Sequence, residues 1–251
     1  MTQAKPTLRT LTILVGVAAS LLLSAAAITP AAAGSRVAPS SASTGSQPTY
    51  YPRIGLISSS TLTARSGPSS NARVVKTFHQ FRPDYLPTVL LAVAEQRDAA
   101  GRLWLKVSVP GRPNGRYGWV SAEFVDSIPI YKEVVVDLSS RTLSVYDHGR
   151  LRYRTRVAIG TRRNPTPTGN FYIQARFKPT DRILGAFAFE TSAYSPTLTE
   201  WPGGGVVGIH GWNDPSVLGR AVSHGCIRVS NGAALYLKRQ LLSGTPVTIR
   251  A

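Results

Sequence analysis

Short apolar segments, separated by glycine, proline and serine, recur from residue 54 to the C-terminus and are the feature that most limits the fold. Segments of this kind with turn residues between them are typical of β-strands. One stretch alone has the length and apolar spacing of a helix, residues 231–242, with Ser230 placed to cap its start and Ser243 and Gly244 to end it. The sequence therefore predicts a mostly β protein with one C-terminal helix.

The first group of segments, residues 54–128, has the spacing of a small barrel of short strands. Strands are expected at residues 62–65, 73–75, 89–93, 103–107 and 117–120. The turn Arg65-Ser66-Gly67-Pro68 and the strand Gly118-Trp119-Val120 resemble those of a bacterial SH3-like domain. That resemblance implies association with the cell wall, with Trp104 and Trp119 as contact residues. A tryptophan in so small a domain is more often part of the core, and we interpret both as core residues.

The second group, residues 131–251, contains alternating or continuous apolar runs that predict a β-sandwich. The expected strands lie at residues 133–138, 142–146, 151–159, 171–175, 186–190, 205–210 and 246–250. A proline-rich loop at residues 164–169 restricts the backbone before one of them. Cys226 is expected on a strand that leads toward the helix.

The chain begins with a segment, residues 1–33, that has the properties of an export signal. Lys5 and Arg9 precede an apolar run at residues 11–28, and small residues follow it. An uncleaved membrane anchor is the alternative, because the run approaches spanning length. Residues 34–53 are rich in small and polar residues and predict a flexible linker. We therefore expect an exported protein of the cell wall, periplasm or extracellular face, bound to the membrane only if the signal is uncleaved.

Basic residues outnumber acidic ones by 29 to 12, which gives a formal net charge of +17. Such a balance predicts anionic partners, among which nucleic acid is the common one. Export argues against nucleic acid and favours anionic cell-wall polymers and the carboxylates of wall peptides. Most of the basic residues are arginine, whose planar guanidinium suits carboxylates. The alternative is that these arginines only keep the surface soluble.

The only cysteine, Cys226, follows a serine, a histidine and a glycine, and a thiol in this setting is a candidate nucleophile. A thiol needs a base or a cation to ionise at neutral pH. His224 would share a face with Cys226 on an extended strand, and His210 would return to it across a loop. Gly225 allows close approach of a carbonyl, so the amides of Gly225 and Cys226 are candidates for an oxyanion pocket. Two alternatives are a buried, inert cysteine and a zinc site, although zinc lacks a fourth ligand here.

Longer motifs surround these residues. They are Ala158-Ile159-Gly160, Pro165-Thr166-Pro167-Thr168-Gly169, Ile209-His210-Gly211 and Ser223-His224-Gly225-Cys226-Ile227-Arg228-Val229. Together they resemble the L,D-transpeptidase (YkuD-type) catalytic domain. The resemblance implies that Cys226 is the nucleophile and His210 the base, with the Gly211 carbonyl orienting the imidazole.

The same resemblance implies that His224, Gly225 and the Cys226 amide line the oxyanion pocket. Substrate contacts are expected from Ser223, Arg228 and Trp212. Arg228 stands where some family members have asparagine, and its expected role is to hold a substrate carboxylate.

Enzymes of this family cleave the bond after the third residue of a peptidoglycan stem peptide, hold the donor as a thioester and pass it to an amine of a second stem. Transfer to water would make the protein a carboxypeptidase, and the sequence does not separate the two. A wall-binding protein with a silent catalytic domain is a further alternative, although no substitution at Cys226, His210 or Gly225 supports it. Neither a metal nor a cofactor is expected.

Overall fold

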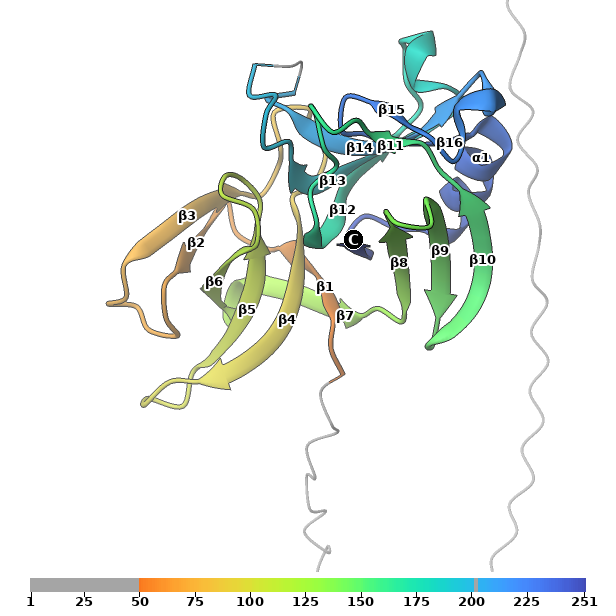
Figure 1. The fold of residues 1–251 in the computed structure, drawn as a ribbon. Coiled ribbons are helices and arrows are strands. Elements are labelled where there is room, and N and C mark those ends of the chain that lie inside the picture. The colour runs from red at the N-terminus through yellow and green to blue at the C-terminus, as the bar shows by residue number, and fades with distance from the viewer. Residues whose placement is uncertain (1–49, 201–202) are drawn as a thin grey trace, which may run out of the picture. The chain divides into compact units, whose positions relative to one another are not determined.

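The computed structural model describes residues 50–200 and 203–251. The expected export signal and nearly all of the expected linker lie outside these residues. Regular structure in the described part is almost entirely β-strand with one α-helix, which confirms the predicted fold class (Figure 1). Within the same residues, no helix is long and apolar enough to cross a membrane.

The N-terminal sheet has seven strands in the order β3-β2-β6-β5-β4-β1-β7. Its strands are β1 (Arg53–Ile57), β2 (Thr61–Arg65), β3 (Val74–His79), β4 (Val89–Arg97), β5 (Leu103–Val109), β6 (Arg116–Ser121) and β7 (Val125–Pro129), with a 3-10 turn at Ala122–Phe124. Leu90, Val107 and Val120 are fully buried in its core. Trp104 is also buried and donates from Nε1 to Asp98 at 3.0 Å, so its assignment to the core is confirmed. Trp119 is half-buried, and the SH3-like identity of this sheet stays a prediction.

The C-terminal sheet has eight strands in the order β10-β9-β8-β17-β12-β13-β14-β16. Its strands are β8 (Lys132–Asp137), β9 (Thr142–Asp147), β10 (Arg150–Arg156), β12 (Gly169–Phe177), β13 (Ala188–Tyr194), β14 (Val206–Trp212), β16 (Ile227–Ser230) and β17 (Pro246–Arg250). Two 3-10 turns lie at Arg182–Leu184 and Pro215–Val217. The last strand of the chain joins the two halves of this sheet, because Val247 lies opposite both Val134 and Phe171.

The expected strand at residues 151–159 is divided in the structure. β10 ends at Arg156, and β11 (Ile159–Gly160) pairs instead with β15 (Ala221–Ser223) in a separate two-stranded sheet. The Ala158 amide and carbonyl both bond to the backbone of Arg228, at 2.9 Å each. The chain leaves the sheet edge here because its backbone groups find partners in the segment that carries the cysteine.

The single helix, α1 (Asn231–Gln240), follows β16 directly and packs against β14 and β16 (Figure 1). Ser230 caps it, because its Oγ accepts from the Ala233 amide at 3.1 Å, as the sequence predicts. The helix ends two residues before the expected position. Ala234 and Leu237 are fully buried and belong to the same core as the inward side chains of β14 and β16. The helix therefore supports the two strands that carry the candidate site.

Candidate functional site

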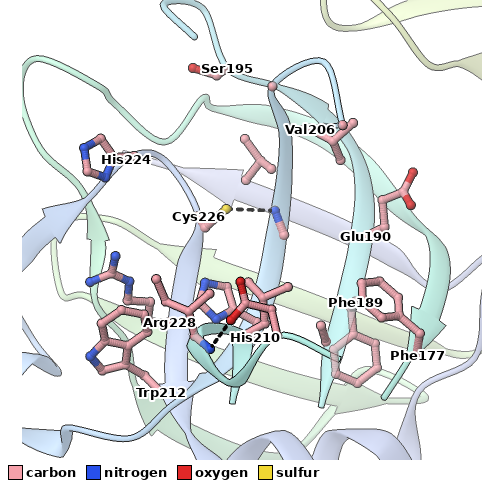
Figure 2. A pocket seen from close by; sticks show the side chains of 18 of the residues that line it. Phe177, Phe189, Glu190, Ser195, Val206, His210, Trp212, His224, Cys226 and Arg228 are labelled. Atoms are coloured by element: carbon pink, nitrogen blue, oxygen red, sulfur yellow. Dashed lines mark hydrogen bonds between the residues drawn. The ribbon is translucent and has the colours of Figure 1, made fainter. Parts of the chain in front are cut away.

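The parallel pair β14 and β16 places the candidate residues on one face of the C-terminal sheet. In the register of this pair, Ile209 lies opposite Ile227 and His210 lies opposite Arg228. Side chains alternate along a strand, so the two isoleucines enter the core beneath while His210, Trp212 and Arg228 share the other face. Figure 2 shows these side chains around Cys226.

Cys226 lies immediately before β16, and its sulfur accepts a hydrogen bond from the Gly208 amide at 3.4 Å (Figure 2). Burial raises the pKa of the Cys226 thiol above its usual range, while the Gly208 amide and the Arg228 charge oppose that effect. Burial is the largest of these influences, so the resting thiol is protonated at neutral pH. The thiol would need a base to remove its proton before it could act as a nucleophile.

His210 is 4% exposed, and its Nδ1 lies 2.8 Å from the Gly211 carbonyl oxygen. A carbonyl only accepts, so Nδ1 carries the proton and Nε2 is left as the basic nitrogen. Burial lowers the pKa of His210, the bond to Gly211 opposes this, and the Arg228 charge adds to the lowering. The imidazole is therefore neutral at neutral pH and is oriented as the resemblance implies.

The protonation state of the resting thiol leads to a test by alkylation. Because burial raises the Cys226 pKa, we expect iodoacetamide to label the folded protein at pH 7 more slowly than it labels the same thiol in urea. The rate should rise with pH and keep rising above the usual thiol pKa of about 8.5. Faster labelling of the folded protein at pH 7 would instead indicate a resting thiolate stabilised by His210.

The segment between β15 and β16 is a turn, which corrects the expectation that His224 and Cys226 share a face of an extended strand. Gly225 has φ +114°, a conformation that residues with a side chain rarely adopt, and this bends the chain. His224 and Cys226 nevertheless both line the same cavity. The turn, and not strand alternation, places both side chains in the cavity wall.

Ser223 is 1% exposed, and its hydroxyl is used within this turn. It accepts from the Gly225 amide at 3.1 Å and donates to the Cys226 carbonyl at 2.5 Å. Ser223 does not line the cavity in the described part of the chain, so the structure places it as a support of the turn. The Gly225 amide would have to exchange its bond to Ser223 before it served an oxyanion.

Thr166, in the proline-rich loop, is a supporting residue to which the sequence assigns no role. It is 5% exposed, accepts from the Gly160 amide at 2.9 Å and donates to the Gly225 carbonyl at 2.8 Å. The loop therefore holds the cysteine turn from behind. The motif that contains Thr166 was recognisable in the sequence, but its contact with Gly225 was not.

The change Thr166→Val removes the hydroxyl and nearly keeps the shape of the side chain. Two buried backbone groups, at Gly160 and Gly225, then lose a partner, so the free energy of unfolding should fall by about 1–3 kcal/mol. Urea denaturation measures this loss. Thr168→Val, at an exposed position of the same loop, is the matched control. Equal stability of the two variants would contradict the supporting role of Thr166.

Arg228 lies with its guanidinium carbon 3.6 Å from the centre of the Trp212 ring. Its Nε is buried and has no hydrogen-bond partner among the described residues. Burial lowers the Arg228 pKa, although the group stays charged at neutral pH. Arg228 lines the cavity and carries a positive charge, which suits an anionic ligand, and the contact with Trp212 fixes the plane of its guanidinium.

Asn231, the first residue of α1, is a second support that the sequence did not identify. Its Oδ1 accepts from the Ala186 amide at 2.8 Å, and its Nδ2 donates to Asn213 at 2.8 Å. A Cβ on Gly211 would lie 2.3 Å from the same Oδ1, so only glycine fits there. Gly211 does not line the cavity and acts through its carbonyl, which holds His210.

The cavity over these residues has a volume of about 540 Å³, within the usual size of a ligand site. One side is formed by His210, Trp212, His224, Cys226 and Arg228. The opposite side is largely apolar and is formed by the ends of β12, β13 and β14, the segment around Ile183, and Arg82 from the loop after β3. No group of three or more histidine, cysteine, aspartate or glutamate side chains in residues 50–200 and 203–251 is placed to hold a metal ion.

Comparison with known proteins finds similarity over the C-terminal half. A family profile described as L,D-transpeptidase catalytic domain (YkuD) matches residues 131–249. The putative L,D-transpeptidase YkuD of Bacillus licheniformis is 36% identical over 124 residues, which are 49% of this chain and 67% of the relative. The protein of the same name from Bacillus subtilis is 32% identical over 124 residues, 49% of this chain and 69% of the relative.

Solved structures similar to this chain include the following two. The Ldtfm–avibactam carbamoyl enzyme is 25% identical with a TM-score of 0.36, over 48% of this chain and 49% of that chain. The match therefore spans about half the length of that protein. An L,D-transpeptidase from Mycobacterium smegmatis is 19% identical with a TM-score of 0.42, over 65% of this chain and 90% of that chain.

Proposed function

Because this chain belongs to the L,D-transpeptidase family, whose members are cysteine acyltransferases that act on peptidoglycan, we propose that it is an exported enzyme that cross-links or remodels stem peptides. One observation carries the proposal. The Cys226 sulfur, bonded to the Gly208 amide, shares a cavity with a buried neutral imidazole whose Nδ1 is bound to Gly211. Such a thiol and base can support acyl transfer through a thioester.

In the first half of the reaction, the His210 Nε2 takes the proton of the Cys226 thiol, and the sulfur attacks the carbonyl carbon of the third stem residue. A tetrahedral oxyanion forms and is stabilised by the Cys226 amide and by the Gly225 amide, which exchanges its bond to Ser223 for one to the oxyanion, with His224 beside it. The carbon–nitrogen bond to the fourth residue then breaks. The imidazolium returns its proton to the departing amine, and the donor remains on Cys226 as a thioester.

In the second half, an amine of another stem attacks the thioester carbonyl and gives a proton to His210. The carbon–sulfur bond breaks, the sulfur regains its proton, and a new amide joins the two stems. Water in the place of the amine would release the trimmed stem, which is the carboxypeptidase alternative. The apolar side of the cavity, opposite Arg228, offers contact area for a peptide chain and favours neither acceptor.

Arg228 and Trp212 are proposed to bind a carboxylate of the stem peptide. The position of Arg228 in the cavity wall and its stacking on Trp212 support this role, because a preorganised guanidinium loses little entropy when it binds. Ser223 contributes by holding the turn and not by touching the substrate.

The N-terminal sheet is proposed to be an SH3-like wall-binding domain, and the segment before it a signal for export. The seven short strands of the N-terminal sheet support an SH3-like domain. The basic charge of the chain supports anionic wall polymers as additional partners. These proposals place the protein in the cell wall, the periplasm or at the extracellular face.

Mass spectrometry of residues 34–251 incubated with disaccharide-tetrapeptide fragments tests the proposed reaction. We expect a transient mass gain on Cys226 that equals the donor without its terminal residue. A cross-linked dimer among the products would select transpeptidation, and a trimmed monomer would select the carboxypeptidase. Absence of both adduct and product, from protein shown to be folded, would contradict the proposal and favour a wall-binding protein with a silent catalytic domain.

A further inference from the structure

Two loops of the N-terminal sheet contact the hairpin formed by β13 and β14, which is one wall of the thiol cavity. We propose that Asn114 and Arg112 are positioning residues, which hold this hairpin in the shape that binds the donor stem peptide. Arg82, which itself lines the cavity, supports the same hairpin through its ion pair with Glu190. The inference rests on the proposed function, because it assigns a substrate wall at the same site. The N-terminal sheet would then be a part of the stem-peptide site as well as a wall-binding domain.

Asn114, in the loop between β5 and β6, binds the backbone at the end of β13. Its Nδ2 donates to the Tyr194 carbonyl at 2.8 Å, and its Oδ1 accepts from the Tyr194 amide at 2.9 Å. The register between β13 and β14 is irregular from Glu190 to Tyr194, and the pairing of β12 with β13 reaches only Thr191. The asparagine amide therefore takes the place of a neighbouring strand where the regular pairing stops.

Arg112, in the same loop, binds the chain that follows β13. Its Nε and Nη2 donate to the Ser195 carbonyl at 3.3 and 3.0 Å, and Nη2 also donates to the Leu198 carbonyl at 3.1 Å. The guanidinium lies 5.0 Å from the centre of the Tyr194 ring. Ser195 lines the cavity and bonds through its amide to the carbonyl of Gly205, another lining residue, at 2.8 Å.

Arg82, which follows β3, makes the third contact. Its Nη2 and Nη1 donate to the two carboxylate oxygens of Glu190 on β13 at 2.7 and 3.1 Å, and its Nε bonds to Asp84. Burial disfavours the charged form, but the hydrogen bonds that Arg82 donates to Glu190 and Asp84 outweigh this and hold the Arg82 pKa above its ordinary value. Both side chains of the Arg82–Glu190 pair are largely shielded, with 20% and 25% of their surface exposed. The pair is therefore less screened than one on the open surface.

The Arg82 contact is close to the reacting sulfur. Glu190 lies opposite Gly208 in the pairing of β13 with β14, and the Gly208 amide is the group that donates to Cys226. The N-terminal sheet is thus connected to the thiol by three successive contacts, which are the Arg82–Glu190 ion pair, the pairing of β13 with β14 and the hydrogen bond from Gly208 to Cys226.

Asn114 and Arg112 do not line the cavity in the described part of the chain, and no hydrogen bond joins them to Cys226 or His210 there. Their removal should therefore weaken the binding of a peptide that needs the whole wall. It should leave the reaction of a small reagent with the thiol unchanged, because the groups around the sulfur remain in place. This difference separates a positioning role from a general loss of stability.

The test measures binding and turnover in Asn114→Ala and Arg112→Ala. Binding of disaccharide-tetrapeptide is measured in the Cys226→Ser background, where no turnover is needed, and kcat and KM are measured with Cys226 present. We expect Kd and KM to rise about tenfold, since each change removes two or more hydrogen bonds. The kcat and the rate of alkylation by iodoacetamide should change less than twofold. Arg112→Lys keeps the charge and a donor, and should recover part of the loss.

Matched controls are Asn71→Ala and Arg73→Ala, two exposed positions between β2 and β3. The inference would be overturned if Asn114→Ala and Arg112→Ala bound the peptide with the same Kd as the controls. If an alanine variant unfolds, the milder changes Arg112→Lys and Asn114→Asp are measured instead. The inference would also be overturned if both of these bound the peptide with the Kd of the unchanged protein. If Asn114→Ala and Arg112→Ala bind the peptide more weakly, but the protein with Cys226 present never forms a thioester, the positioning role is supported and the proposed reaction is rejected. No binding by any folded version would reject both.

Discussion

Replacing Cys226 with serine is expected to abolish thioester formation while the fold stays intact. Serine differs from cysteine by one atom, and its hydroxyl still offers an acceptor to the Gly208 amide. A hydroxyl holds its proton more tightly than a thiol, so it is a far weaker nucleophile even beside a base such as His210. The rate of acylation by tetrapeptide should fall by a factor on the order of 1,000 or more.

Intact-protein mass spectrometry reads the result of the Cys226→Ser change, and circular dichroism with urea unfolding reports the fold. Ser223→Ala is a useful comparison, because it loosens the same turn without touching the nucleophile. An adduct that persists in Cys226→Ser would mean that another residue carries the donor. Our assignment of the nucleophile would then be wrong.

Replacing His210 with alanine is expected to have the second largest effect, a loss of about 100- to 10,000-fold in acylation rate. The reason is that the neutral imidazole, held by Gly211, is the group able to take the thiol proton. The loss should become smaller as pH rises toward the raised pKa of Cys226, because the thiolate then forms without help. A stopped-flow or quenched time course between neutral and alkaline pH measures both effects.

His224→Ala and His79→Ala are the comparisons for the His210 change. His224 is exposed and lines the same cavity, whereas His79 is exposed on β3 in the N-terminal sheet. We expect His224→Ala to slow acylation less than His210→Ala, and His79→Ala to leave it unchanged. If His224→Ala is the more damaging change in equally folded protein, then His224 and not His210 is the base.

If the positioning role of Asn114 and Arg112 holds, the two sheets are linked through substrate binding as well as through the chain. A free catalytic domain would then bind stem peptides more weakly than the whole protein, because the β13–β14 hairpin would lose the contacts at Tyr194 and Ser195. The N-terminal sheet would then restrict which peptides fit the cavity.

Most of the fold class follows from the sequence, because it depends on local patterns. Alternating apolar residues predicted most strands of both sheets, although β1, β7 and β15 were not expected. Ser230 and Gly244 marked the limits of the helix to within a few residues. Cys226 and His210 were also identifiable, since their residue types and the motifs around them lie within short stretches. Their roles as nucleophile and base stay predictions that the substitutions above test.

The supports of the site were decided only by the tertiary structure. The bond from Gly208 to Cys226 joins positions 18 apart, that from Thr166 to Gly225 positions 59 apart, and that from Asn114 to Tyr194 positions 80 apart. No local pattern specifies such contacts, because they depend on which strands pair and in which register. The turn at Gly225 also depends on the tertiary structure. Its positive φ is kept by hydrogen bonds to Ser223 and Thr166 together and not by glycine alone. The sequence determined which side chains are able to react, and the pairing of distant strands determined how they are held.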